Sequence, residues 1–355
     1  MRVTKLRSMM AEHSVDAVLV LNELNQHYFS EFAFTDGLLF ITQKKAYLVT
    51  DFRYYEMALN KANKHFEVVM PEKRKEFLSG VISDHNIKVI GFEGSSVSYE
   101  TYRNYCDDYP SCEFLNIGSS IEKIRQVKSA DEIEKMQKAQ DITDKALKHL
   151  LGIITPNMTE LDVAVELEYA MRKGGADSFA FETIAVSGKA SALPHGTPRN
   201  VKLEKGFLTM DFGAKFEGYC SDMTRTVVIG KADEEIKKLY NTVLKAQTEA
   251  LAYLKEGADC GEADKIARDI IDAIPEYKDA FGHSLGHSVG LFIHESPRLY
   301  SRGFGRKLRV GEVVTVEPGI YLFGKYGCRI EDMVAICENG IHNFTHSPKD
   351  LIEIL

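Results

Sequence analysis

Apolar residues at the start of the chain recur at helical spacing and then gather in short runs. Val3, Leu6, Met9 and Met10 fall on one helical face, which predicts an amphipathic helix over residues 2–13. The expected elements after it are strands at 16–21, 37–42 and 46–50, a helix at 53–64, a strand at 66–70, a helix at 75–84 and a strand at 88–92. Because strands and helices alternate, we expect an α/β domain with a mixed sheet.

A strongly helical segment begins near residue 130 and marks a second domain. Ser129 and Glu132 have the spacing of a capping box, and Gly152 and Pro156 end the helix. The elements expected from there on are helices at 130–151 and 159–173, a strand at 182–187, a hairpin at 207–226, helices at 234–255 and 261–274, and strands at 311–321 and 327–337. We therefore expect an α/β (α+β) protein with two domains, residues 1–122 and 123–355.

The hairpin at 207–226 reads FLTMDFGAKFEGYCSDMTRT and carries two aspartates. A polar turn at 214–218 separates its β-like arms. Asp211 ends the first arm and Asp222 lies in the second, so the two carboxylates are able to face each other across the strands. Carboxylates held side by side repel each other unless a cation lies between them. The alternative is that both aspartates only cap turns. This stretch alone favours neither the metal-binding interpretation nor the turn-capping one.

The strands near the end of the chain copy the layout of that hairpin. Glu317 ends the first strand in GEVVTVEPGIY, and Glu331 lies in the second in GCRIEDMVAIC. Helices precede each pair of strands, which predicts an internal pseudo-twofold repeat. Such a repeat is expected to place four carboxylates at the centre of one curved sheet.

Four histidines lie in two glycine-containing segments between these strands. His283, His287 and His294 occur within FGHSLGHSVGLFIHESP, where three glycines permit close backbone approach, and this favours a site over core packing. His195 lies in the loop LPHG, where an ordinary surface histidine is the alternative reading.

Composition narrows the class of protein. A hydrophobic share of 44%, a charged share of 27% and a formal net charge of −8 are typical of a soluble globular protein and argue against a nucleic-acid binder. The chain has no apolar run long enough for a membrane helix and no apolar signal-peptide centre, so we expect a cytoplasmic protein without membrane contact. Its six cysteines form no CxxC pair and are expected to be free thiols.

The carboxylates and one histidine form an oxygen-rich ligand set. Four negative charges gathered together require about two divalent ions, and such ligands suit Mn²⁺ or Co²⁺ as well as Zn²⁺. Two ions about 3.5–4 Å apart clamp a carbonyl oxygen and activate a bridging hydroxide, which is the machinery for amide hydrolysis. Arg329 lies two residues before Glu331 and so shares its strand face. It either anchors a substrate carboxylate or serves as a structural ion-pair partner.

The motifs MDFGAKFEGYCSDMTRT, GHSLGHSVGLFIHESP, TVEPGIY and CRIEDM, in this order, resemble the pita-bread metallopeptidases. That family includes Xaa-Pro dipeptidase (prolidase), aminopeptidase P, methionine aminopeptidase and creatinase. The likeness covers the chain from about residue 125 onward. The segments NELNQHYFSEFAFTDGLLFIT and AYLVTDFRYYEMA further resemble the creatinase/prolidase N-terminal domain.

The resemblance implies a role for each residue at a matching position. It implies metal ligation by Asp211, Asp222, His287, Glu317 and Glu331, with Asp222 and Glu331 bridging both ions. Glu331 also matches the acid/base, and His195 and His294 match the histidines that stabilise the reaction intermediate. His283, Tyr321 and Arg329 match further substrate-binding positions.

The function that the resemblance implies is hydrolysis of the bond between an N-terminal residue and proline in short peptides. A dipeptidase is favoured slightly over an aminopeptidase, because the N-terminal domain is compact and the chain short. Two divalent ions are expected, with Mn²⁺ favoured and Co²⁺ or Zn²⁺ possible, and a homodimer is implied by analogy alone. The alternatives are a non-proline aminopeptidase, a creatinase-like amidinohydrolase, and a non-catalytic binding descendant.

Overall fold

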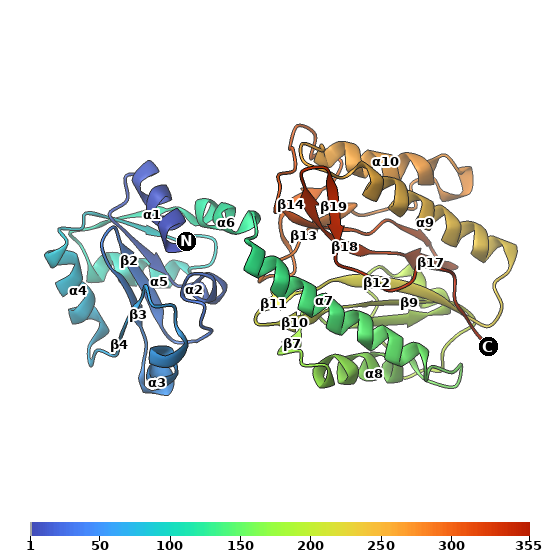
Figure 1. Cartoon of the computed structure of the whole chain (residues 1–355), viewed down its shortest axis with the longest axis horizontal. Helices are drawn as coiled ribbons and strands as arrows, with labels where there is room; N and C mark the ends of the chain where they lie inside the picture. The colour runs from blue at the N-terminus through green and yellow to red at the C-terminus, as the bar shows by residue number, and fades with distance from the viewer. Residues whose placement is uncertain (1) are drawn as a thin grey trace. The chain divides into compact units, whose positions relative to one another are not determined.

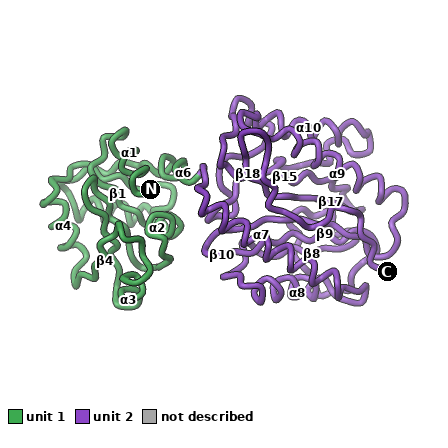
Figure 2. Tube along the Cα trace, in the orientation of Figure 1, with its two compact units in different colours: residues 1–125 green, residues 126–355 purple. Residues whose placement is uncertain are grey.

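The computed structural model describes residues 2–355, and the chain divides into two compact units, residues 1–125 and 126–355 (Figure 2). The division falls at the end of helix α6 (Gly118–Gln126), whereas the boundary expected from the sequence at 122/123 lies inside this helix. No helix among residues 2–355 combines the length and the apolar character that crossing a membrane requires.

Unit 1 is a mixed sheet with helices around it. The strand order is β4-β3-β2-β1-β5-β6, in which β1 pairs antiparallel with β2 and parallel with β5. Its elements are α1 (Arg2–Glu12), β1 (Ala17–Val20), α2 (Glu23–Ser30), β2 (Leu38–Thr42), β3 (Ala46–Val49), α3 (Phe52–Lys61), β4 (Glu67–Val69), α4 (Arg74–Asp84), β5 (Val89–Phe92), α5 (Tyr99–Asp108) and β6 (Glu113–Asn116). The expected α/β domain with a mixed sheet is confirmed.

Four elements of unit 1 were absent from the sequence prediction, namely α2, α5, β6 and most of α6. Helix α5 buries none of its residues, and the edge strand β6 buries none either, so neither carries an apolar pattern. Helix α2 begins after Asn22, whose side chain accepts a hydrogen bond from the backbone N–H of Asn25. These elements are set by capping and by neighbouring strands rather than by amphipathic spacing.

Unit 2 places two helix pairs around two main sheets (Figure 1), which are antiparallel except where β12 pairs with β20, and it also contains the smaller sheets β11-β10-β7 and β16-β17. Its helices are α7 (Ala130–Leu151), α8 (Glu160–Lys173), α9 (Glu234–Tyr253) and α10 (Cys260–Asp272), with short 3₁₀ turns η1 (Gly188–Ala192) and η2 (Pro275–Tyr277). Its strands are β7 (Ser178–Phe179), β8 (Ile184–Ser187), β9 (Gly206–Phe212), β10 (Ala214–Phe216), β11 (Tyr219–Cys220), β12 (Met223–Ile229), β13 (Gly286–Ser288), β14 (Glu295–Leu299), β15 (Val313–Val316), β16 (Gly319–Leu322), β17 (Tyr326–Arg329), β18 (Asp332–Cys337), β19 (Gly340–Asn343) and β20 (Glu353–Ile354).

The alternation of side chains along β9 determines which of them reach the site. Leu208, Met210 and Phe212 belong to the core that α7 and α8 cover. Phe207 packs in the other core, under α9, and its odd-numbered neighbour Asp211 shares that face. The aspartate therefore ends a strand whose opposite side is anchored by buried apolar residues.

The first hairpin is more elaborate than its sequence suggested. Strands β9 and β12 pair antiparallel, but Asp211 lies opposite Thr224 and not opposite Asp222. The expected turn at 214–218 contains the short strand β10, the chain reverses at Glu217 and Gly218, both with positive φ, and the short strand β11 follows directly. Two successive residues with positive φ are what a tight hairpin turn requires.

The single curved sheet expected at the centre was wrong in detail. Backbone pairing gives a four-stranded sheet, β20-β12-β9-β8, and a five-stranded sheet, β14-β13-β15-β18-β19. Between β12 of the four-stranded sheet and β17 of the separate sheet β16-β17, the Thr226 Oγ1 hydroxyl donates a hydrogen bond to the backbone oxygen of Arg329.

The expected strands at 311–321 and 327–337 are each broken in two. The first break is at Glu317 and Pro318, because proline has no N–H to give to a ladder. The second break is at Ile330 and Glu331. Both glutamates thus lie where the chain changes direction, at the ends of strands rather than within them.

Candidate metal centre and substrate cavity

A cavity of about 630 Å³ in unit 2 collects nearly all the site residues expected from the sequence. The expected residues that line it are His195, Asp211, Asp222, His283, His287, His294, Glu317, Arg329 and Glu331. Tyr321 is the exception among the expected residues, because it lies behind the wall and contacts His283 and Arg329. The volume suits a small ligand.

Acidic side chains from both halves of the repeat converge at the floor of the cavity. Asp211 comes from β9, Asp222 precedes β12, Glu317 follows β15, and Glu331 precedes β18. Ligand atoms of Asp222, His287 and Glu331 all lie within 4.8 Å of one another, and all three residues are buried. The ends of strands from two sheets therefore meet at one point.

The ring of His287 is aimed at these carboxylates. Its Nε2 lies 3.5 Å from Asp222 Oδ2 and 3.4 Å from Glu317 Oε1. Its Nδ1 faces the backbone oxygen of Ser288 at 3.2 Å, so Nδ1 carries the hydrogen. Burial lowers the pKa of His287 to about 3, so the imidazole is neutral. A neutral ring that turns its lone pair toward two carboxylates needs a cation between them to be stable.

The electrostatics of the carboxylates agree with this reading. Burial, and then the charge of Asp211 and Glu317, raises the pKa of Asp222 well above its usual range. Burial, reinforced by neighbouring carboxylates, does the same to Glu331 and raises the pKa of Glu317 to about 8. Asp211 Oδ1 is buried without a hydrogen-bond partner among the described residues. The donor set therefore fits divalent metal ions.

Close backbone approach places His287 in this position. A side chain at Gly286 would collide with the backbone oxygen of Thr315 on the neighbouring strand. Thr315 Oγ1 in turn accepts a hydrogen bond from the backbone N–H of His287 and donates one to Glu317 Oε1. Gly286 thus allows β13 to come near enough to β15 for these residues to share the site.

Arg329 is engaged by residues of the site itself. Its guanidinium donates to Asp211 Oδ2 at 2.7 Å, to the Tyr321 hydroxyl at 2.7 Å and to Thr224 Oγ1 at 3.0 Å. Its side chain is only 4% exposed. This geometry favours the structural ion-pair alternative for Arg329, with Asp211 as the partner.

A relay of hydrogen bonds leads from Arg329 to His283. The Tyr321 hydroxyl accepts from Arg329 and lies 2.9 Å from His283 Nε2, while His283 Nδ1 faces the Ser284 backbone oxygen. Burial lowers the pKa of His283 to about 4, so its Nε2 accepts from the tyrosine. The relay fixes the ring of His283 against the cavity wall.

The two remaining histidines are exposed on the cavity wall. The ring of His294 stands edge-on to that of His287, with centroids 4.5 Å apart. His195 lies in the loop after η1, and this loop is held by the buried carboxylate of Glu160. Glu160 accepts hydrogen bonds from the backbone N–H of Ser187 and from both backbone and side chain of Arg199.

Sequence reasoning missed Arg298, which also lines the cavity. Arg298 is exposed, and its side chain has no hydrogen bond or ion pair with another residue of 2–355. The signal was present, because Arg298 lies four positions after His294 in an extended segment and so shares its face.

Comparison with known proteins gives the same assignment for both units. Metallopeptidase family M24 matches residues 134–338, and the creatinase/prolidase N-terminal domain matches residues 2–127. The uncharacterised peptidase YqhT of Bacillus subtilis is 41% identical over 354 residues, with 99% of each chain covered.

Solved structures agree over the whole length. The Xaa-Pro dipeptidase of Bacillus anthracis superposes with a TM-score of 0.94 at 39% identity, and the X-Pro aminopeptidase of Thermotoga maritima with 0.91 at 36% identity, each covering 99% of both chains. The expected kinship with pita-bread metallopeptidases is confirmed. The chain belongs to metallopeptidase family M24 and carries a creatinase/prolidase N-terminal domain.

Proposed function

We propose that this protein is a dinuclear Xaa-Pro peptidase that acts on short peptides, with the dipeptide as its preferred substrate. The observation that carries the proposal is the convergence of four acidic side chains on the neutral ring of His287 beside a cavity of about 630 Å³. A non-catalytic descendant has no reason to keep this costly arrangement of buried carboxylates.

In the proposal, the metal site consists of Asp211, Asp222, His287, Glu317 and Glu331. Asp222 and Glu331 are assigned to bridge two divalent ions, with Mn²⁺ favoured and Co²⁺ or Zn²⁺ as alternatives. When bound, the ions supply a Lewis acid for the scissile carbonyl and a hydroxide at neutral pH.

The chain's own groups are assigned the binding and proton steps. Glu331 accepts a proton from the attacking water and returns it to the leaving amine. His294 and His195 line the wall and donate hydrogen bonds to the oxygen on which negative charge develops. Arg329 holds Asp211 in place through its ion pair, and His283 and Tyr321 shape the wall.

Arg298 favours a dipeptide over a longer peptide. In a dipeptide the carboxylate directly follows proline, and an unpaired guanidinium on the cavity wall is a suitable partner for it. Arg329 already binds Asp211, Tyr321 and Thr224, so Arg298 replaces it as the proposed carboxylate anchor. The homodimer remains part of the proposal, by analogy with relatives of the same domain composition.

The test compares an Xaa-Pro dipeptide with the matching Xaa-Pro-Yaa tripeptide, using Mn²⁺-loaded protein whose metal content is counted. The proposal predicts that the dipeptide is cleaved with the higher kcat/KM. Cleavage mainly of the tripeptide would replace the dipeptidase by an aminopeptidase, as the name of the Thermotoga relative suggests. If metal is bound and neither peptide is cleaved, the result would instead favour a different hydrolase on the same scaffold, such as a creatinase-like enzyme.

Replacement of the free cation tests the carboxylate anchor. Arg298→Ala is expected to raise KM for the dipeptide by about 10- to 100-fold, as the loss of a charge-assisted hydrogen bond requires. Cleavage of the dipeptide amide, which has no carboxylate, is expected to change little. Equal effects on the acid and the amide would remove Arg298 from substrate recognition.

A further inference from the structure

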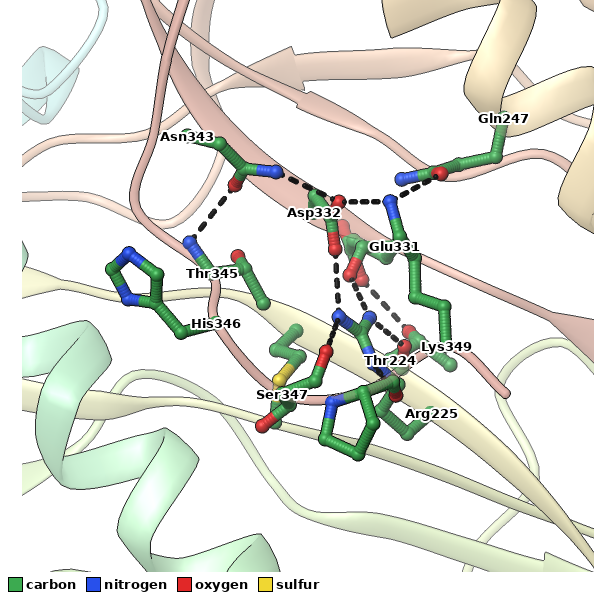
Figure 3. A network of polar contacts seen from close by, with 12 residues as sticks. Thr224, Arg225, Gln247, Glu331, Asp332, Asn343, Thr345, His346, Ser347 and Lys349 are labelled. Atoms are coloured by element: carbon green, nitrogen blue, oxygen red, sulfur yellow. Dashed lines mark hydrogen bonds and ion pairs between the residues drawn. The ribbon is translucent and has the colours of Figure 1, made fainter. Parts of the chain in front are cut away.

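A buried network of charged groups contacts the backbone of Glu331 (Figure 3). It connects Arg225 on β12, Asp332 on β18, and Lys349 in the C-terminal segment. Neither Arg225 nor Asp332 lines the cavity, and the side chains of both are at most 3% exposed. The proposed mechanism therefore gives them no task.

Arg225 uses its whole donor capacity in this network. Nη1 donates to the backbone oxygens of Glu331 at 2.6 Å and of Thr224 at 2.9 Å. Nη2 donates to Asp332 Oδ1 at 2.8 Å and to the backbone oxygen of Ser347 at 2.9 Å. Nε donates to the backbone oxygen of Pro348 at 3.0 Å. A guanidinium has five N–H donors, so none is left over.

Asp332 is the anionic centre of the network. Its Oδ1 accepts from Arg225, and its Oδ2 accepts from Lys349 Nζ at 2.7 Å and from Asn343 Nδ2 at 3.0 Å. Asp332 thus forms ion pairs with two cations, Arg225 through Oδ1 and Lys349 through Oδ2. Adjacent side chains of an extended chain point to opposite sides, which sends Asp332 into the network while Glu331 faces the cavity.

Glu331 depends on this network because no sheet holds its backbone. Residues 330 and 331 lie between β17 and β18 and belong to neither strand. The N–H of Glu331 donates to the backbone oxygen of Thr224, and its own backbone oxygen accepts from Arg225. The carboxylate is oriented from the same strand, since Thr224 Oγ1 donates to Glu331 Oε2 at 2.7 Å.

The rest of the network connects the backbone around Glu331 to helices α7 and α9. Ser347, whose backbone oxygen binds Arg225, also donates through Oγ to Asp144 on α7 at 2.6 Å. Lys349 donates to Gln247 on α9 at 2.9 Å as well as to Asp332. Arg225 therefore joins the strand that follows Asp222 to the peptide of Glu331, and the C-terminal segment fixes that junction against α7 and α9.

We propose that Arg225 and Asp332 are positioning residues that set the separation of Asp222 and Glu331, and thereby the affinity of the site for its second metal ion. The inference rests on the assignment of these two carboxylates as bridging ligands in the proposed function. Groups behind metal ligands commonly contribute 10- to 100-fold to metal affinity or activity.

The test is a calorimetric titration of folded Asp332→Asn with Mn²⁺ at 25 °C, below its melting temperature. The substitution keeps the shape of the side chain and removes the charge that orients Arg225. The affinity for at least one of the two Mn²⁺ equivalents is expected to fall by about 10- to 100-fold. Arg225→Lys is expected to show the same loss, because an ammonium cannot reach all five acceptors.

Glu312→Gln is the matched control. Glu312 is likewise fully buried and pairs with two arginines, Arg306 and Arg309, but it precedes β15 at the end opposite Glu317. The Glu312→Gln substitution is expected to lower the melting temperature and to leave the Mn²⁺ affinity unchanged. If Asp332→Asn likewise lowers only the melting temperature and leaves the Mn²⁺ affinity unchanged, the positioning role is overturned.

Lys349→Met decides the matter if Asp332→Asn does not fold, since it removes only one of the donors to Asp332. Weaker binding of one Mn²⁺ equivalent supports the inference, and unchanged affinity overturns it. The titration involves no peptide, so metal binding without Xaa-Pro cleavage would refute only the proposed specificity. A wild-type protein that binds no Mn²⁺ would refute both.

Discussion

At the scale of single residues, the site is recognised by groups that are unfavourable without a ligand. His287 is neutral and turns its lone pair toward Asp222 and Glu317, and Asp211 Oδ1 is buried with no donor among the described residues. Each of these features is destabilising by itself. Divalent ions in the space between these groups would stabilise all of them together.

The division between metal-binding and substrate-binding histidines is tested at His294. His294→Ala is expected to lower kcat by about 100-fold, as for the loss of one donor to a developing oxyanion, and to leave metal content intact. Metal counting and steady-state kinetics on the same sample measure both quantities. His342→Ala, at a ring outside the cavity that bonds to Gln137, is the control and is expected to behave as wild type. Loss of metal from His294→Ala would show that the division is wrong.

At the scale of elements, the groups that we assign to catalysis are placed by chain breaks and by loops that buried side chains hold in position. Glu317 and Glu331 lie where strands are interrupted, and His195 lies in a loop after η1. Glu160 is buried and binds both ends of that loop region, through the N–H and hydroxyl of Ser187 and through Arg199. A carboxylate remote from the cavity thus fixes a residue on its wall.

This role of Glu160 predicts a combined loss of stability and activity. Glu160→Gln is expected to lower the free energy of unfolding by about 1–3 kcal/mol, since hydrogen bonds to a charged group are lost in the interior. It is also expected to reduce kcat/KM as the His195 loop becomes less ordered. Urea unfolding and dipeptide kinetics give the two values.

Glu204→Gln is the matched control, because Glu204 also contacts Arg199, at 3.4 Å, but is exposed. An exposed pair contributes about 0–1 kcal/mol, so little change is expected. Equal effects of the two substitutions would show that Glu160 has no special part in holding the loop.

At the scale of the whole molecule, the sequence predicted the two domains and the strands that carry the proposed metal ligands, because alternation and capping are local signals. It missed α5 and β6, which bury no residue, and the breaks in the last strands. It also missed the ion pair of Arg329 with Asp211 and the network of Arg225 and Asp332, because those contacts join residues about a hundred positions apart. Such pairs leave no periodic pattern in a single sequence.

Metal removal is expected to destabilise the protein as a whole. Binding of Mn²⁺ to the folded state alone adds about 2.7 kcal/mol per site at a concentration 100 times Kd. The stabilisation is expected to be larger at pH 8 than at pH 6, because the carboxylates must lose their protons to bind metal. The test measures the urea midpoint with chelator and with Mn²⁺ at each pH. The prediction is contradicted if Mn²⁺ does not raise the midpoint, or if it raises the midpoint by the same amount at pH 6 and at pH 8.

The most direct test of the central claim is to titrate metal-free protein with Mn²⁺ and to follow bound metal and Xaa-Pro dipeptide hydrolysis together. The account predicts two bound equivalents and full turnover only when both are present. Asp222→Ala and Glu331→Ala are expected to lose the second equivalent and the activity at once, because each is assigned to bridge the ions. Near-normal hydrolysis by either variant, or by the chelated wild type, would contradict the dinuclear account.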